Sequence, residues 1–448
     1  MKHRIWVMVS IILAILTASL DTTIVNTTMP TITRELGGMS LYAWSFASYM
    51  IASTVLSPIA GRLSDMFGRK RVYGAGIVIF LLGSLLCGTA NTMLQLVLYR
   101  VVQGAGAGFM MPFPAIIAGD LFSVAQRGRI QAFFTSMWGI SAIIAPLLGS
   151  LFVTYTSWRW IFYVNVPVCL ICLLTLLPYK EVYQPKPAKV DWFGALLFAL
   201  GVSMLLAVTV SESGRWLLGL GGVLFLAAFF LFERKHASPI VPLQLFRNRP
   251  VAGMITVTFL SCAAMFGAST YVPLFLQHSG YSLFLSGVAL LGMSAGWMAV
   301  AVPAGKWILK YGYRPLLLIG NATLVVSGVW FWFVKGTLGF WYAFAGMTVQ
   351  GLAFGMLFTV CMIGAQQLVA PDQKGLSSSM QMFARNIGTA VGVTLMGMFV
   401  SEHGDDAQTV LSGMHSLFTY GLIGSLVALA SVLLVTAVRD PEEERQAV

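Results

Sequence analysis

Residues 102–110 read VQGAGAGFM, and residues 349–357 read VQGLAFGML. A second pair of similar stretches, GRLSDMFGRKR at 61–71 and GKWILKYGYRP at 305–315, is separated by nearly the same length of chain. A single short glycine-rich match is weak evidence, but two pairs at one separation predict a structural repeat. Repeated halves around a central cavity are typical of membrane transport proteins.

The sequence between and around these repeats is apolar. Of the 448 residues, 58% are hydrophobic and 10% are charged, whereas soluble globular proteins carry about 25% charged residues. So few charges could not cover a surface in water, and apolar runs of about 20 residues are long enough to cross a bilayer as helices. We expect fourteen such helices, at 5–29, 42–61, 72–90, 94–118, 131–154, 160–178, 191–210, 216–232, 251–276, 284–304, 315–334, 339–363, 379–400 and 416–437.

The 27 Lys and Arg residues fall unevenly on the two sides of these helices. If the N-terminus is cytoplasmic, the outer loops hold only Arg34, Arg159, Arg215 and Lys335. Two more, Arg100 and Arg385, lie within helices, and the rest are cytoplasmic. This asymmetry obeys the positive-inside rule with both termini in the cytoplasm. The net charge of +11 is therefore an orientation signal and does not indicate nucleic-acid binding.

Two polar, proline-containing segments, 180–190 and 233–250, bracket the seventh and eighth expected helices, as linkers do. The predicted fold is all-α and integral to the membrane, with two six-helix bundles and two extra central helices. Its expected parts are an N-terminal bundle at 1–180, a linker with helices 7 and 8 at 181–248, a C-terminal bundle at 249–438 and a cytoplasmic tail at 439–448.

Asp21 stands deep inside the first expected helix, where a carboxylate costs about 3 kcal/mol to insert. Such residues usually face a cavity and mark an ion or proton path, although a permanent structural ion pair is the alternative. Arg100 lies at a similar depth in the fourth helix. We expect it to face the interior, with Asp21 or backbone carbonyls as its partner.

Further polar side chains within the apolar spans are candidates for a substrate cavity. Gln103 and Gln350 occupy equivalent positions in the two repeats and could bind either substrate or neighbouring helices. The other candidates are Asn26, Asn165 and Gln381.

Two motifs that could suggest other chemistry are interpreted as helix packing. The glycines of GAGAG at 104–108 lie in an apolar span with no preceding strand, so they do not form a phosphate-binding loop. Cys169 and Cys172 form a CxxC, but no second pair or nearby His supports a metal site. Because no GxxxxGK[ST] motif occurs, transport would be passive or driven by an ion gradient.

These stretches resemble motifs of the major facilitator superfamily. GRLSDMFGRKRVY at 61–73 resembles its motif A, LYRVVQGAGAGFMMP at 98–112 its motif B, and GISAIIAPLLGS at 139–150 its antiporter motif C. LDTTIVNTTMPTI at 20–32 is similar to the first-helix motif of the fourteen-helix drug:proton antiporter branch, with Asp21 as its acid.

The resemblance implies alternating access by two six-helix bundles. In motif A, Asp65 and Arg69, framed by Gly61 and Gly68, would then latch the bundles on the cytoplasmic side; the spacing alone also fits a solvated loop. The resemblance further implies that three residues bend the fifth helix and favour exchange over leak: Gly139, Pro146 and Gly149.

We therefore expect a proton-coupled antiporter that exports lipophilic cations or amphipathic drugs, with Asp21 serving proton and substrate in turn. It would act as a monomer in the cytoplasmic (inner) membrane, with the proton as coupling ion and no cofactor or metal. The alternative is a proton symporter that imports a small metabolite, against which motif C argues. An enzyme is not expected, because all five histidines fall in or near loops.

Overall fold

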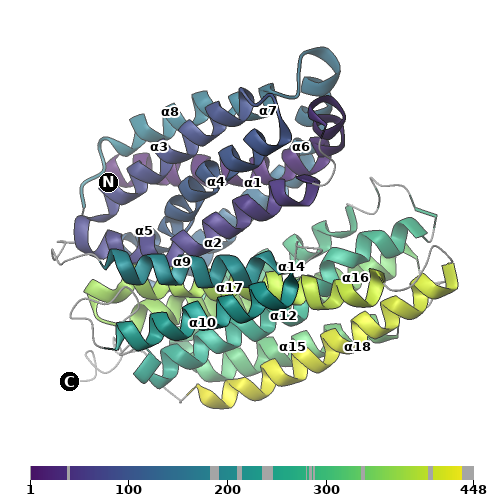
Figure 1. The fold of residues 1–448 in the computed structure, drawn as a ribbon. Helices are drawn as coiled ribbons and strands as arrows, with labels where there is room; N and C mark the ends of the chain where they lie inside the picture. The colour runs from purple at the N-terminus through teal and green to yellow at the C-terminus, as the bar shows by residue number, and fades with distance from the viewer. Residues whose placement is uncertain are drawn as a thin grey trace. The chain divides into compact units, whose positions relative to one another are not determined.

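The computed structural model contains helices and no strand among the residues that it describes (Figure 1). Those residues are 2–37, 41–181, 191–208, 214–234, 246–278, 280, 281, 285, 288–333, 339–401 and 407–435. Most of the expected linker at 180–190 and the whole expected tail at 439–448 lie outside them.

The helices follow one another with short connections. They are α1 Lys2–Leu36, α2 Tyr42–Phe67, α3 Arg69–Gly88, α4 Met93–Met110, α5 Phe113–Leu121, α6 Val124–Tyr155, α7 Trp160–Tyr163, α8 Asn165–Leu176, α9 Trp192–Ala207, α10 Arg215–Glu233, α12 Arg249–His278, α14 Leu291–Tyr311, α15 Tyr313–Trp332, α16 Phe340–Gln367, α17 Lys374–Ser401 and α18 Ala407–Ser431. Two 3₁₀ turns, Pro371–Gln373 and Val432–Leu434, complete the set.

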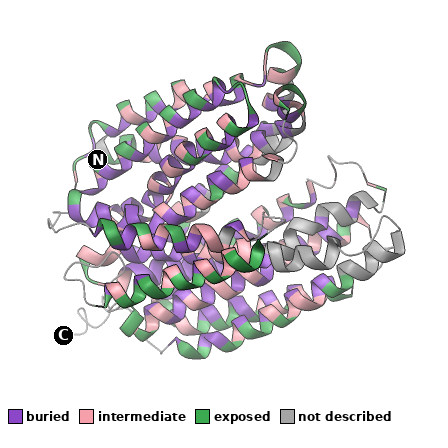
Figure 2. Ribbon diagram, viewed as in Figure 1, coloured by how far each residue is buried: buried purple, intermediate pink, exposed green. Residues whose placement is uncertain are grey.

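Long apolar helices make this chain a multi-pass membrane protein. Within the described ranges, eight helices are long and apolar enough to cross a bilayer. Helix α10 is an example of such a helix, and much of its apolar surface is exposed (Figure 2). Its Trp216 is 92% exposed, and Leu217 and Leu220 are also exposed. Such a surface is stable in lipid and would be an aggregation liability in water.

The chain divides into two compact units. The first comprises Met1–Leu121, Met137–Leu243 and Ala370–Met380, and the second comprises Phe122–Ser136, Gln244–Val369 and Gln381–Val448. The start of α17 thus belongs to the first unit and the start of α6 to the second. Helices α9 and α10 belong to the first unit, where α9 packs against α2. The division into six, two and six membrane-spanning helices stays a prediction.

The repeat-related glycines make the same contact in each unit. In the first unit, a Cβ added to Gly104 of α4 would overlap the carbonyl oxygen of Tyr49 on α2. In the second unit, a Cβ added to Gly351 of α16 would overlap the carbonyl oxygen of Met293 on α14. Glycine at these positions lets two helix backbones approach closely. The two VQG stretches therefore occupy equivalent helix–helix contacts.

The stretch 61–71 is helical on both sides of one glycine, which corrects the expected loop. Helix α2 continues to Phe67 and α3 begins at Arg69, so Gly68 alone turns the chain, with a φ of 98°. Gly312 has a φ of 74° between α14 and α15. A residue without a Cβ adopts this conformation at little cost, which is why so short a connection works.

Two expected helices are broken into shorter pieces. The span expected at 94–118 forms α4 and α5, which are separated by Met111 and Pro112. Proline removes a backbone donor and clashes with the preceding turn, so a helix breaks there. The span expected at 160–178 forms α7 and α8, with Val164 between them.

Candidate functional site

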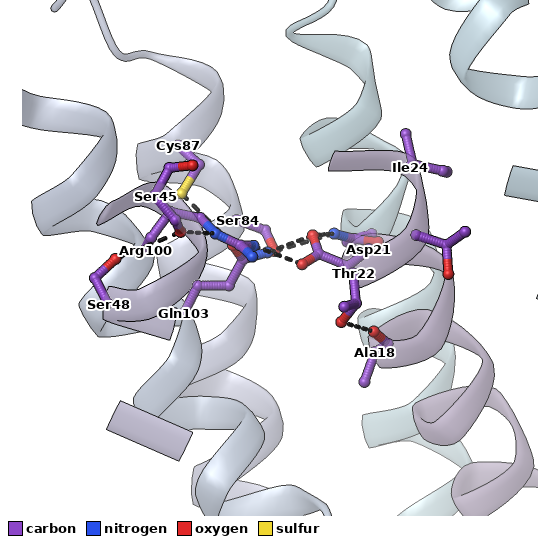
Figure 3. A network of polar contacts seen from close by, with 12 residues as sticks. Ala18, Asp21, Thr22, Ile24, Ser45, Ser48, Ser84, Cys87, Arg100 and Gln103 are labelled. Atoms are coloured by element: carbon purple, nitrogen blue, oxygen red, sulfur yellow. Dashed lines mark hydrogen bonds and ion pairs between the residues drawn. The ribbon is translucent and has the colours of Figure 1, made fainter. Parts of the chain in front are cut away.

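Asp21 lies at the centre of a buried polar network in the first unit (Figure 3). Arg100 Nη1 donates to Asp21 Oδ2 at 2.6 Å, and both side chains are about 1% exposed or less. The other carboxylate oxygen, Oδ1, accepts hydrogen bonds from Gln103 Nε2 at 2.7 Å and from Asn165 Nδ2 at 3.0 Å. Both oxygens of the carboxylate are therefore engaged by donors from helices α4 and α8.

Arg100 is held in place by groups other than the carboxylate. Its Nη1 also donates to Gln103 Oε1 at 2.8 Å, and its Nε donates to the Ser45 carbonyl oxygen at 3.3 Å. Its Cζ lies 4.2 Å from the centre of the Tyr49 ring on α2, within the range of a cation–π interaction. These contacts stabilise the arginine at this depth in addition to its ion pair with Asp21.

The predicted pairing of Asp21 with Arg100 is confirmed. Gln103 and Asn165 were predicted as cavity residues. Both are buried, and both donate hydrogen bonds to the Asp21 carboxylate. Sequence reasoning missed Ser84 of α3, whose Oγ accepts from Gln103 Nε2 at 2.8 Å and from Asn165 Nδ2 at 3.3 Å. A serine in an apolar span gives no signal of its own, and only the fold brings it to the network.

A second charged cluster lies where α2 meets α3. Asp65 and Arg69, four residues apart, form a buried ion pair across Gly68. Asp65 Oδ1 also accepts from the backbone N–H of Gly375 at 3.1 Å, and Oδ2 from that of Leu376 at 2.9 Å. These N–H groups begin α17, and the positive end of a helix dipole favours a carboxylate there.

Titration would change this contact. Asp65 lies beyond the expected end of the second span, and burial raises the pKa of its carboxyl to about 6, against the lowering effect of Arg69. A proton on Asp65 would remove the charge that the first turn of α17 binds. We therefore expect the contact to weaken as pH falls through about 6.

Two acids that sequence reasoning missed complete the cluster. Arg69 Nε donates to Asp120 Oδ2 of α5 at 3.3 Å. The side chain of Glu181 packs beside the start of α3, and its Oε1 accepts a hydrogen bond from the Lys70 backbone N–H at 2.5 Å. Both lie far from residues 61–71 in sequence, so no local pattern could assign them.

The glycines of motif A are explained by close approach. A Cβ added to Gly61 would overlap Ser379 Oγ at the start of α17, and one added to Gly68 would lie 2.5 Å from Glu181 Oε2. Gly139 and Gly149 lie within α6. The side chains of Asn26 and Pro146 lie outside the described residues, although both belong to helices.

The predicted cavity residues of the second unit do not gather around one acid. Gln350 donates from Nε2 to the Met265 carbonyl oxygen at 3.3 Å and lines a small cavity with Phe331 and Phe418. Gln381 accepts at Oε1 from Thr258 Oγ1 at 2.7 Å. No group of His, Cys, Asp or Glu in the described part of the chain could hold a metal ion.

A multi-pass helical fold with repeated helix contacts and a buried ion pair in its apolar interior is typical of membrane transport proteins. The model of the Major Facilitator Superfamily matches residues 11–302 and 295–448. This chain belongs to that superfamily of transporters.

Its relatives include multidrug transporters. The chain is 32% identical over 420 residues to the multidrug transporter protein MdtP of Bacillus subtilis (strain 168), covering 91% of this chain and 77% of that protein. It is 33% identical over 407 residues to multidrug resistance protein 3 of the same organism, covering 88% and 78%. A solved structure of the proton:xylose symporter XylE bound to 6-bromo-6-deoxy-D-glucose aligns with a TM-score of 0.69 over 100% of this chain and 99% of that one. At 16% identity, this last likeness concerns the fold alone.

Proposed function

We propose that this protein is a proton-coupled antiporter that exports hydrophobic drugs or toxic compounds by alternating access. The observation that carries the proposal is the Asp21–Arg100 ion pair, buried in a membrane helix and bonded on both carboxylate oxygens. Buried ionisable groups at this depth are costly, and they are retained where ions or protons move. The multidrug relatives support drug efflux as the activity.

In this proposal Asp21 exchanges a proton for a substrate. Arg100 neutralises the carboxylate while the site is closed. Water or an entering compound that separates the two charges leaves Asp21 free to take a proton or a cationic group, and the two exclude each other. Inward flow of protons would thereby be tied to outward flow of lipophilic cations or amphipathic drugs, with no cofactor.

We further propose that fourteen helices cross the cytoplasmic membrane of the cell, with both termini inside and a monomer as the working unit. Helices α2, α6 and α17 are 26, 32 and 28 residues long. Each exceeds the roughly 20 residues that a bilayer requires. The scarcity of Lys and Arg in the outer loops supports this orientation.

The coupling can be tested in proteoliposomes with an imposed pH gradient. Asp21→Asn should abolish uphill transport of ethidium, because an amide cannot carry the proton. Glu35→Gln is the matched control: it removes another acid of α1, one that is half exposed and pairs with Arg159 at the surface. That variant should keep wild-type coupling.

The direction of dye movement separates antiport from the alternative, a symporter importing a small metabolite. An antiporter moves the dye against the flow of protons, and a symporter moves it with them. Wild-type coupling in Asp21→Asn would remove Asp21 from the mechanism.

A further inference from the structure

Arg385 is the second arginine within the membrane helices, and the proposed proton cycle does not use it. It lies on α17 in the second unit, and four aromatic rings surround its guanidinium. We call these rings the Arg385 cage: Phe266 of α12, Trp297 of α14, and Phe354 and Phe358 of α16. The distances from Arg385 Cζ to their ring centres are 5.9, 5.8, 5.6 and 4.9 Å.

Arg385 has no acid to pair with among the described residues of its own unit. The sequence contains no Asp or Glu at 122–136, 244–371, 373–401 or 407–431. Every described helix of the second unit is therefore free of carboxylates from its first residue to its last. Arg100, the intramembrane arginine of the first unit, has Asp21 at 2.6 Å. The first unit thus holds a neutral pair around Arg100, whereas Arg385 of the second unit has no carboxylate partner among the described residues of that unit.

The aromatic rings of the cage stabilise the positive charge of Arg385, but they provide no hydrogen-bond acceptors for its N–H groups. Aromatic rings stabilise a cation over their faces, whereas a guanidinium also carries five N–H donors. Within the described residues, no hydrogen-bond acceptor contacts Arg385. The side chain is partly exposed, while Trp297 and Phe354 are buried. The donors of Arg385 are therefore accessible and unfilled.

Two neighbouring donors are also without acceptors. Gln381 lies one turn before Arg385 on the same face of α17. Its Oε1 accepts from Thr258, but its Nε2 is buried and has no partner among the described residues. The indole N–H of Trp297 is likewise buried and unpartnered in the described part of the chain. Unfilled buried donors are costly, so this combination favours a ligand that supplies acceptors.

We propose that the Arg385 cage binds the carboxylate of an aromatic substrate, so that this protein carries acidic or zwitterionic aromatic compounds as well as cations. The guanidinium fork matches a carboxylate with two parallel hydrogen bonds. The rings of the cage suit a flat aromatic body beside it. Substrates that bear only positive charge gain nothing here, because Arg385 repels them. The proposal rests on the transport function proposed above and specifies its substrate class.

The test uses two dyes that differ only at one carboxyl group. Rhodamine 110 carries a free carboxylate, and rhodamine 123 is its methyl ester. Equilibrium binding of each dye to the purified full-length protein is measured by fluorescence anisotropy. Arg385→Gln should weaken rhodamine 110 binding about ten-fold or more, the loss expected for a charged hydrogen bond. Rhodamine 123 binding should not weaken, since the ester offers no charged acceptor and Arg385 repels its positive charge.

Matched variants separate the site from general effects of charge. Lys306→Gln removes an exposed cation of α14 in the same unit and should leave both affinities unchanged. Arg385→Lys keeps the charge but loses the two-pronged geometry, so rhodamine 110 binding should fall only in part. If Arg385→Gln does not give a folded protein in size-exclusion chromatography, the same binding measurements are made with Arg385→Lys and Gln381→Leu. Each of these should selectively weaken rhodamine 110 binding.

The result that overturns the proposal is an equal change for both dyes, or no change, in folded variants. Transport of the same dyes in proteoliposomes is a separate measurement. A wild-type protein that moves neither dye contradicts the proposed function. A selective loss of rhodamine 110 binding still supports the cage as a carboxylate site in that case.

Discussion

At the scale of single residues, Asp21 is one acceptor shared by three donors. Asn165→Leu removes one of its hydrogen bonds, at 3.0 Å, and should lower the free energy of unfolding by about 1.5–3 kcal/mol, the range for hydrogen bonds to charged groups. The same substitution made in an Asp21→Asn background should cost less, because the charge it served is gone. Equilibrium unfolding of the wild type, the two single variants and the double variant in mixed detergent micelles gives the interaction energy between Asn165 and Asp21. Costs that add to within about 0.5 kcal/mol would show that the two residues act independently.

The ion pair could be predicted from the sequence because charged residues are rare in membrane helices, and the depth of a residue follows from its position along the helix. It placed Asp21 and Arg100 together for that reason, and the structure confirms the contact. It did not reach Ser84, because serines are common in membrane helices and nothing in the chain indicates which helix a hydroxyl faces. The cage around Arg385 was missed for a similar reason: its rings come from three helices other than its own.

At the scale of elements, the junction of α2 and α3 depends on one glycine. Gly68→Ala should lower the apparent melting temperature for two reasons: a φ of 98° strains any residue with a Cβ, and the new Cβ would lie 2.5 Å from Glu181 Oε2. Together these should cost roughly 1–3 kcal/mol. Gly214→Ala is a reference for a milder case: Gly214 has φ 70° and ψ 15°, in the left-handed helical region, and nothing lies within 4 Å of the added Cβ.

The contact with Glu181 is isolated within the Gly68→Ala background, where the backbone strain is constant. Glu181→Ala in the Gly68→Ala background should recover the part of the loss that the overlap causes, and it should recover none of the strain. If Glu181→Ala recovers none of the loss in the Gly68→Ala background, the glycine is needed for its backbone conformation alone.

The junction also marks the limit of local sequence patterns. The sequence singled out Asp65 and Arg69 within one short stretch, and the two form an ion pair. Asp120 and the first turn of α17 complete the cluster, and they come from distant parts of the chain. Long-range partners of this kind depend on the packing of whole helices, which hydropathy does not determine.

At the scale of the whole molecule, the repeat was the most informative feature of the sequence. The same glycine contacts recur at Gly104 and Gly351, and the same turn recurs at Gly68 and Gly312. The charges do not follow this symmetry, because the second unit has no equivalent of Asp65 in its stretch 305–315. Duplicated packing with unequal charge allows the two units to take different roles in one transport cycle.

The number of crossings can be tested at α10, the most exposed of the candidate spans. Its 19 residues extend about 28 Å, close to the roughly 30 Å of a bilayer core. If α10 crosses the membrane as the positive-inside rule predicts, Arg215→Cys lies outside and Arg234→Cys lies in the cytoplasm. A membrane-impermeant maleimide should then label the first variant in intact cells, and the second only after permeabilisation. The wild-type chain provides a low background, because its five cysteines are all buried. Equal labelling of both variants from outside would mean that α10 lies along one face of the membrane and that the chain has fewer crossings than fourteen.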